Sequence, residues 1–436
     1  MPKKIIVIFI IVFILIGGGM LAYYFSTNTN ETPSTQNNTN TTPEGYQQFN
    51  PFGTGIKTNT DNTVPSTPEN NTNTSTTTPA VSTTSKFYKI TDFAVAGAGY
   101  FDDTRPLPEE MVTATTATVA TPVETTPSKT KSKKSTPKVV TPPAPKVEIV
   151  PSIRYVERST GHIYQMYLDN GTRGKISNST IPGIYEAIFD SKAKSVIYRY
   201  LSTLDGSITS FLATLGSQNN SFLPSNIEAV TLSPDKSKFF YLAHNSNGVT
   251  GTIGSFEETK RTQVFSSPFS EWIPQWVGDK TIFLTTKASY LVNGTLFSMN
   301  TNNGYMTKVL GGVPGLTTLA NNKGNVVLYS VVVDSGPKLG IFNVNTHATK
   351  DINMYGLPEK CVWSVDNINV YCAVPRAISG NQYPDIWYQG LVSFDDNFIK
   401  INSNDGSIVA LAESSNSDPI DGTSLFLSKD ESILFF

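Results

Sequence analysis

The stretch IEAVTLSPDKSKFFYLA, from Ile227 to Ala243, contains two short runs of β-branched and aromatic residues around the polar turn PDKSK. Such runs on either side of turn residues are typical of a β-hairpin. Similar hairpins recur along the chain, and the turn centres lie near Asp190, Asp235, Asp279, Lys323, Asp366 and Asp430. The intervals are 45, 44, 44, 43 and 64 residues, so about 20 residues are inserted after Asp366. This period predicts a repeat protein with several strands per unit.

A second series of turns has the same period. It consists of Thr160-Gly161, Asp205-Gly206, Asn247-Gly248, Asn293-Gly294 and Ser335-Gly336, at intervals of 45, 42, 46 and 42 residues. Gly supplies the positive φ that a two-residue hairpin loop requires. Because a transmembrane barrel or a sandwich would not show this period, the two series together predict an all-β chain that forms a β-propeller.

The number of blades depends on FAVAGAGYF (93–101). If this segment is the inner strand of the first blade, seven blades result. They are expected at about 93–178, 179–222, 223–268, 269–313, 314–357, 358–415 and 416–436. Six blades is the alternative, with SIRYVER (152–158) and HIYQMYL (162–168) completing the C-terminal blade.

The last hairpin, at 424–436, ends in its second strand and leaves an open apolar edge. Exposed edges of this kind invite pairing with another strand. We therefore expect either that the chain continues beyond this point or that N-terminal strands cover the edge. The segment KFYKITD (86–92) is a candidate to pair with the last blade and close the ring.

The N-terminal residues 1–25 are expected to form a cytoplasmic tip and a single transmembrane helix. The run 5–25 is uncharged, largely apolar and long enough to cross a hydrocarbon core of about 30 Å. Lys3 and Lys4 precede the run and place the N-terminus in the cytoplasm, with the propeller outside the cell membrane. A cleaved signal peptide is the alternative, because Gly17, Gly19 and Ala22 are small residues near the end of the run.

Two further segments have the composition of disordered chain. Residues 26–85 are rich in Thr, Asn, Ser and Pro and are expected to form a stalk with an end-to-end distance of about 45 Å. The propeller is expected at 86–436, with a low-complexity insertion at about 102–150. This insertion carries a basic run at Lys129, Lys131, Lys133, Lys134 and Lys138, which we interpret as a solvated loop.

The segments AVTLSPDKSKFFYLA (229–243) and SLFLSKDESILFF (424–436) resemble the S-P-D-G repeats of TolB-like and WD-repeat-like bacterial β-propellers. The resemblance implies the propeller fold and transfers no functional residue. This chain departs from the pattern because Lys236 and Glu431 stand where the family has Gly. The layout of anchor, stalk and propeller also resembles surface proteins of small-genome bacteria.

The sequence gives no sign of catalysis, a metal or a cofactor. The histidines His162, His244 and His347 are far apart and lack the spacing of metal ligands, and no hydrolase signature is present. The formal net charge of −2 gives no bulk attraction to nucleic acid. We therefore predict a protein that is not an enzyme, and the oligomeric state stays open.

The two cysteines, Cys361 and Cys372, lie in the hairpin CVWSVDNINVYC with Asp366 and Asn367 at its tip. The cysteine pair and the tip pair are centred on the same point of the sequence. The two cysteines are therefore expected to face each other across two antiparallel strands. At that distance a disulfide is possible, and it is expected in an oxidising compartment. A buried reduced pair is the alternative.

The blade 6 insertion (residues 374–394) is the stretch that interrupts the repeat. Long loops on a rigid scaffold commonly carry function. Its aromatic and hydrogen-bonding side chains are of the kinds that dominate binding hot spots. The candidate binding residues are Arg376, Tyr383, Asp385, Trp387, Tyr388 and Gln389. The alternative is that Trp387 and Tyr388 are part of the core.

Together these features predict a membrane-anchored, extracytoplasmic propeller that serves as an interaction scaffold for an envelope protein or polymer. Membrane contact is expected through residues 5–25. Two alternatives remain: a carbohydrate-binding or carbohydrate-active propeller, and a subunit or sensor of a larger membrane complex. A cluster of carboxylates near the central axis would favour the carbohydrate alternative.

Overall fold

A computed structural model describes residues 87–106, 147–202, 206–217, 220–378, 380–414 and 418–436. Within these residues, no helix combines the length and the apolar character that spanning a membrane requires. The predicted anchor and stalk (1–85) and the basic run of the insertion at about 102–150 lie outside the described residues.

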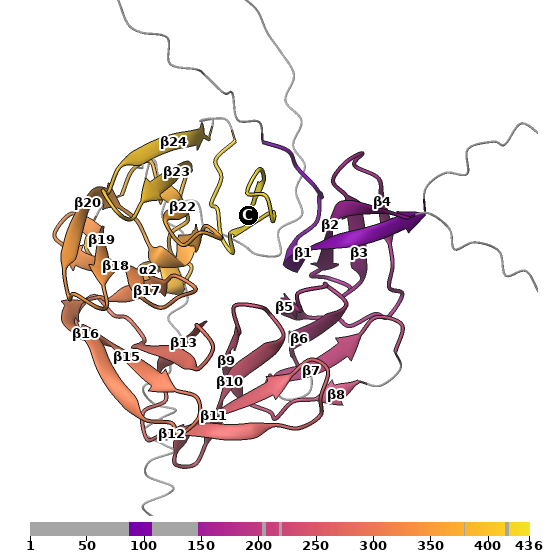
Figure 1. Ribbon diagram of the computed structural model, residues 1–436, viewed down its shortest axis with the longest axis horizontal. Coiled ribbons are helices and arrows are strands. Elements are labelled where there is room, and N and C mark those ends of the chain that lie inside the picture. Colours follow the sequence, from indigo (N-terminus) through magenta and orange to yellow (C-terminus); the bar gives the residue numbers. More distant parts are fainter. Residues whose placement is uncertain (1–86, 107–146, 203–205, 218–219, 379, 415–417) are drawn as a thin grey trace, which may run out of the picture. The chain divides into compact units, whose positions relative to one another are not determined.

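All the described residues belong to one compact unit, Ala80–Phe436, built from antiparallel sheets that follow one another in chain order (Figure 1). The first blade contains β1 (Val95–Pro106), β2 (Val147–Glu157), β3 (Ile163–Tyr167) and β4 (Arg173–Lys175). The second contains β5 (Ile184–Phe189), β6 (Ser195–Leu201), β7 (Ile208–Thr214) and β8 (Ser221–Phe222). The third contains β9 (Ile227–Leu232), β10 (Lys238–Asn245), β11 (Gly248–Ser255) and β12 (Thr262–Ser267).

The fourth blade contains β13 (Trp272–Val277), β14 (Thr281–Thr286), β15 (Asn293–Asn300) and β16 (Met306–Pro314). The fifth contains β17 (Thr317–Ala320), β18 (Val326–Val333), β19 (Gly336–Asn343) and β20 (Thr349–Tyr355). A 3-10 helix, η1 (Pro358–Lys360), leads into the sixth blade, which contains β21 (Cys361–Trp363), β22 (Asn369–Pro375), α2 (Asp385–Tyr388), β23 (Asp396–Asn402) and β24 (Ile408–Glu413). The final strands are β25 (Phe426–Leu427) and β26 (Leu434–Phe435).

The blade count is therefore six, which is the alternative, and the expected seven is wrong. β25 and β26 form a separate sheet that pairs only through Phe426 with Phe435 and Leu427 with Leu434. Among the described residues, this sheet has no third or fourth strand. The route to six also differs from the one expected, because β2 and β3 join β1 in the first blade and do not complete the C-terminal one.

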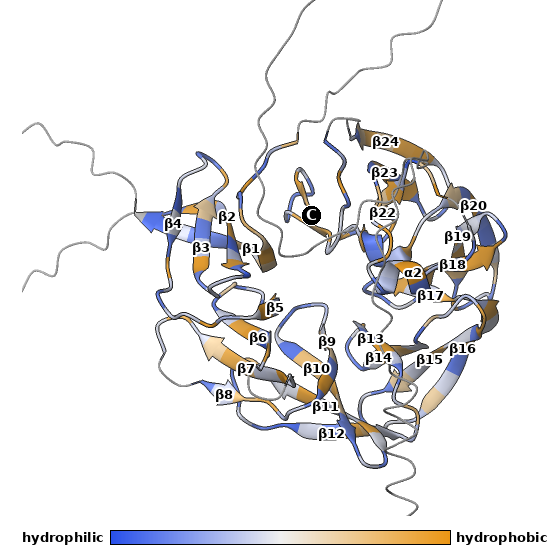
Figure 2. Cartoon of the chain, turned by 180° about the vertical axis from the view of Figure 1, so that it is seen from behind, coloured by the Kyte–Doolittle hydropathy of each residue, from blue (hydrophilic) through white to orange (hydrophobic). Residues whose placement is uncertain are grey.

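Hydrophobic packing between neighbouring sheets holds the blades together. In blades 3 and 4, for example, Phe240 and Leu242 form one buried cluster with Ile282 and Leu284. The second strand of each blade has neighbouring strands on both sides and a neighbouring sheet against its faces. Its sequence is therefore a nearly continuous run of apolar residues. Figure 2 shows apolar residues concentrated along the strands and hydrophilic ones in the connecting loops.

The two-stranded sheet lies between blade 6 and blade 1. Phe435 joins a buried cluster with Ile153 and Tyr155 of blade 1, while Leu425 packs with Ala373 and Phe398 of blade 6. The N-terminal segment 87–94 forms no strand, although it was a candidate to pair here. It contributes through the ring of Phe87, which lies 5.6 Å from the ring of Phe398.

The insertion between β1 and β2 is shorter than the expected 102–150. The two strands continue to pair as far as Pro106 and Val147. Near the end of this paired stretch, the Arg105 guanidinium lies 2.7 Å from both Glu148 and Asp169.

Four of the five turn glycines adopt positive φ, at Gly161, Gly206, Gly248 and Gly336. Only Gly248 and Gly336 close two-residue loops, since they pair with Asn245 and Val333. Gly294 has no positive φ and belongs to β15, so blade 4 has a six-residue loop (287–292) where the repeat predicted a tight turn. That longer loop is part of the candidate site described below.

The replacement Gly97→Ala tests how closely blades 1 and 2 approach. A Cβ atom at this position would lie 1.9 Å from the Ala187 carbonyl oxygen in β5, and the backbone there has no room to move. We expect a loss of about 3 kcal/mol in unfolding free energy, measured by denaturant titration. Gly174→Ala in β4 is the matched control, because nothing lies within 4 Å of a Cβ atom there. Equal stability of the two variants would contradict the close approach.

Candidate functional site

One end of the propeller carries most of the irregular chain. In an antiparallel sheet, connections alternate between the two ends of the strands. The loops from second to third strands and the crossovers from one blade to the next therefore lie on the same side, which we call the loop face. The blade 6 insertion joins β22 to β23 and belongs to this face.

The insertion extends from blade 6 over blade 5 to blade 4. Ile378 lies beside Gly336, the first residue of β19 in blade 5, within 3.4 Å of where a Cβ atom would be. At the start of α2, the Asp385 carboxylate accepts a hydrogen bond of 2.8 Å from the Tyr290 backbone amide in blade 4. The insertion is thus fixed at both ends, and α2 lies against the lengthened loop 287–292.

The predicted binding residues have different roles in the structure. Tyr383 is only 4% exposed and packs with Leu357 and Phe394, so it belongs to the core under the insertion. Trp387 is half-buried against the same cluster. Asp385 is used in the contact with Tyr290.

Tyr388 and Gln389 are exposed at the end of α2. Arg376 lies at the base of the insertion, where its guanidinium contacts Asp395 at 3.1 Å and the Ser414 carbonyl at 3.2 Å. The structure therefore gathers five of the six predicted residues in and around α2, and Arg376 helps to hold the base of the loop.

A buried lysine fastens the insertion to the propeller. The Lys360 side chain is fully buried, and its ammonium group contacts the buried Asp396 carboxylate at 2.8 Å and also the Asp421 carboxylate. It lies over the rings of Phe394 and Trp387, at 5.2 and 5.9 Å from their centroids. Because a buried charge needs partners, this lysine ties together η1, the insertion and the segment 418–425 that leads into β25.

Glu359, next to this lysine, connects η1 with α2. Its carboxylate accepts a 2.5 Å hydrogen bond from the Tyr388 hydroxyl, while its second oxygen is buried and unpaired among the described residues. Burial raises the pKa of Glu359, although the hydrogen bond from Tyr388 opposes that effect.

Exposed apolar side chains lie at the end of α2, just after it and in the neighbouring loop 287–292, and the sequence did not predict them. Leu391 follows the helix and its amide donates to the Ile386 carbonyl. Across the Tyr290 contact lie Leu291 and Val292 of blade 4. The exposed fractions are 76% for Leu291, 58% for Val292, 69% for Leu391 and 36% for Tyr388. The turn series gave no signal for them, because Asn293-Gly294 keeps its regular spacing and only the structure places Gly294 inside β15.

A second polar cluster lies on the loop face of blades 3 and 4. His244 contacts Glu228 at 3.2 Å, and Lys287 contacts Glu271 at 2.7 Å. Burial, followed by the charge of Glu271, raises the pKa of Glu228. Glu228 occupies a β-bulge at the start of β9, and bulges often re-aim a side chain. The sequence repeat could not predict this bulge, because the extra residue does not change the spacing of the turns.

Cys361 and Cys372 are paired residues of β21 and β22 and form a disulfide with a Cα–Cα distance of 4.1 Å. The Ser364 amide donates to the Asn369 carbonyl, so the hairpin loop has four residues. Counting from that hydrogen-bonded pair along the strands, away from the loop, puts the cysteines at a closely spaced, non-hydrogen-bonded position. The disulfide lies just before the chain enters the insertion.

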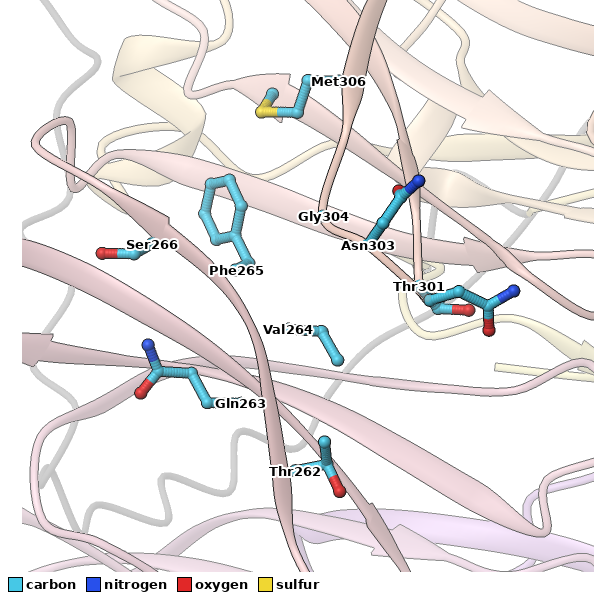
Figure 3. Close-up of a pocket in the computed structure, with 10 residues that line it drawn as sticks. Thr262, Gln263, Val264, Phe265, Ser266, Thr301, Asn303, Gly304 and Met306 are labelled. Atoms are coloured by element: carbon cyan, nitrogen blue, oxygen red, sulfur yellow. The ribbon is translucent and has the colours of Figure 1, made fainter.

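The part of the chain that the structure describes contains no group of three or more His, Cys, Asp or Glu side chains able to hold a metal ion. A pocket of about 650 Å³ opens beside β12 and the β15–β16 turn (Figure 3). Ten residues line it: Thr262, Gln263, Val264, Phe265, Ser266, Thr301, Asn302, Asn303, Gly304 and Met306. Since none of them is ionisable, this pocket offers no acid or base for catalysis.

No protein-family model matches the chain, and no curated protein matches it. Similar solved structures include TolB from Acinetobacter baumannii, at 12% identity and a TM-score of 0.41, with 61% of each chain covered. An oligogalacturonate lyase in complex with manganese has 10% identity and a TM-score of 0.47, over 65% of this chain and 82% of that one. The propeller domain of the Trilobed protease from Pyrococcus furiosus has 11% identity and a TM-score of 0.42, over 61% and 80%. These values are low and assign neither a family nor a function, so the propeller fold rests on the strand order itself.

Replacing Lys360 with Met tests the buried ion cluster. The change leaves the Asp396 and Asp421 carboxylates without their cation, and we expect a loss of about 3–5 kcal/mol in unfolding free energy by urea titration. Lys338→Met is the matched control, since its partner Asp351 is exposed and the expected loss is within about 1 kcal/mol. The double change Lys360→Met with Asp396→Asn should recover part of the loss. Similar losses for Lys360→Met and the control would rule out this role.

Replacing Glu359 with Gln tests the effect of its burial. A carboxyl whose pKa is raised by folding binds its proton more tightly in the folded state, so stability falls as pH rises from the ordinary glutamate range through the folded-state pKa. Gln cannot ionise but still accepts the Tyr388 hydrogen bond. The melting temperature of Glu359→Gln should therefore exceed that of the native protein at pH 7, by about 2 °C or more, and the difference should shrink near pH 4. Glu413→Gln, at the exposed end of β24, controls for loss of a charge.

Proposed function

We propose that this protein is an interaction scaffold that binds a protein partner through the loop face of blades 4 to 6. The observation that carries the proposal is the set of exposed apolar side chains around α2, namely Leu291, Val292, Tyr388 and Leu391. Contiguous exposed apolar groups with a polar surround mark interaction sites on soluble domains. Here they are held on a fixed support, because Asp385 and Lys360 anchor the insertion to blades 4 and 6.

We further propose that the propeller is held outside the cell membrane by residues 5–25 and that its partner is an envelope component. The uncharged apolar run after Lys3 and Lys4 supports the anchor. The Cys361–Cys372 disulfide supports an oxidising compartment, since such bonds persist outside the cytoplasm.

Carbohydrate binding is a second candidate, favoured by one specific observation. Burial and then the charge of Glu271 raise the pKa of Glu228, and His244 and Lys287 contact these two carboxylates. Carboxylate pairs are the working groups of many carbohydrate-active sites. Glu228→Gln should abolish retention on immobilised envelope glycan if this candidate is correct.

A photo-crosslinking amino acid placed at Leu391 tests the scaffold function in intact membranes. We expect one discrete crosslinked protein product from this position. The same amino acid at Tyr305, which is 71% exposed on the opposite end of blade 4, is the matched control and should give none. Equal labelling from both positions, or no product from Leu391, would overturn the proposal.

Removal of residues 5–25 should shift the protein from the membrane fraction to the soluble one.

A further inference from the structure

Charge is distributed unevenly over the loop face. In blades 4 to 6, its connections are residues 268–271, 287–292, 315–316, 334–335, 356–360, 376–395 and 414–425. They contain seven acidic residues, Glu271, Asp334, Glu359, Asp385, Asp395, Asp418 and Asp421, against three basic ones, Lys287, Lys360 and Arg376. Among the described residues, the equivalent segments of blades 1 to 3, including the segment 87–94 that enters β1, contain one acid, Asp92, and two bases, Lys89 and Arg158.

The three cations do not neutralise this excess, because each already has an acidic partner. Lys287 contacts Glu271, Arg376 contacts Asp395, and Lys360 contacts Asp421 as well as Asp396. Four acids remain without a cation within ion-pair distance among the described residues: Asp334, Glu359, Asp385 and Asp418.

Three of these acids lie on segments that carry or contact exposed apolar side chains, and the fourth, Asp418, lies in the crossover from β24 to β25 on the same loop face. Asp385 begins α2, and Glu359 binds the Tyr388 hydroxyl at the other end of the same helix. Asp334 follows Val333, which is itself 37% exposed. Two buried carboxylate oxygens here, Oε2 of Glu359 and Oδ1 of Asp396, have no hydrogen-bond partner among the described residues. Asp396 is fully buried, so its free oxygen is an acceptor that the fold leaves unused.

We infer that the partner of the loop face is a cationic amphipathic protein segment, with apolar side chains that contact Leu291, Val292 and Leu391 and with Lys or Arg residues that face Asp334, Asp385 and Asp418. This inference rests on the proposed function and specifies its partner. Apolar anchors supply most of the binding free energy in such interfaces, whereas complementary charge selects the partner and speeds association. A segment with acidic flanks would meet uncompensated repulsion at the same surface.

Three synthetic peptides test the inference against the full-length protein. They share the same leucine and phenylalanine positions and carry lysine, glutamate or glutamine at every polar position. By fluorescence anisotropy, the lysine peptide should bind most tightly, its affinity should fall as salt rises, and the glutamate peptide should not bind. Equal or tighter binding of the glutamine or glutamate peptide, or no binding of the lysine peptide, would overturn the inference.

Matched variants separate this inference from the proposed function. Asp334→Asn combined with Asp418→Asn should weaken binding of the lysine peptide about threefold to tenfold. Asp279→Asn, an exposed acid in the β13–β14 turn on the opposite face, should leave binding unchanged. Leu391→Ser should weaken binding of every peptide that binds. If Leu391→Ser weakens peptide binding and the paired Asn variant does not, the proposed scaffold function stands and the inference of a cationic partner is wrong.

Discussion

The structure depends on the packing of neighbouring sheets against each other. Each blade has only four short strands, and such a sheet cannot bury its two faces alone. Adjacent sheets therefore share buried clusters, as Phe240 and Leu242 do with Ile282 and Leu284. At one boundary the approach is so close that Gly97 leaves no space for a Cβ atom beside the Ala187 carbonyl. Because this packing holds the sheets in place, the loops that leave them can vary without loss of the fold.

The same packing explains why the sequence predicted the fold well and the candidate site less well. Buried strands have to be apolar and turns have to recur, so runs such as KFFYLAHN and their turns carried a clear period. The predicted number of blades was wrong because a hairpin such as 424–436 has the same sequence pattern in a two-stranded sheet as in a four-stranded blade. Gly294 misled for a related reason, since a glycine required by the nearby Leu316 side chain looks the same as a turn glycine.

The insertion stood out because it broke the repeat, and its composition suggested binding. Composition could not show which of its aromatic rings are buried. Tyr383 lies in the core, whereas Tyr388 is exposed one turn further along. Nor did the sequence show that Leu291 and Val292, about 100 residues away, lie across a single hydrogen bond from Asp385. That contact requires the insertion to reach from blade 6 to blade 4, and Lys360 with its carboxylate partners holds the base of the insertion on the propeller.

The buried lysine also limits how the insertion can respond to a partner. A flexible loop would lose conformational entropy on binding, and the affinity would fall accordingly. Here Lys360 is already held by two carboxylates and two aromatic rings, and Asp385 holds the far end of the loop. The side chains that remain exposed are therefore displayed in a fixed arrangement before any partner arrives. Acids in excess of cations destabilise this part of the propeller slightly through mutual repulsion, and a cationic partner would relieve that repulsion on binding. Binding and stability should consequently be linked, so occupancy by such a partner should raise the melting temperature of the propeller.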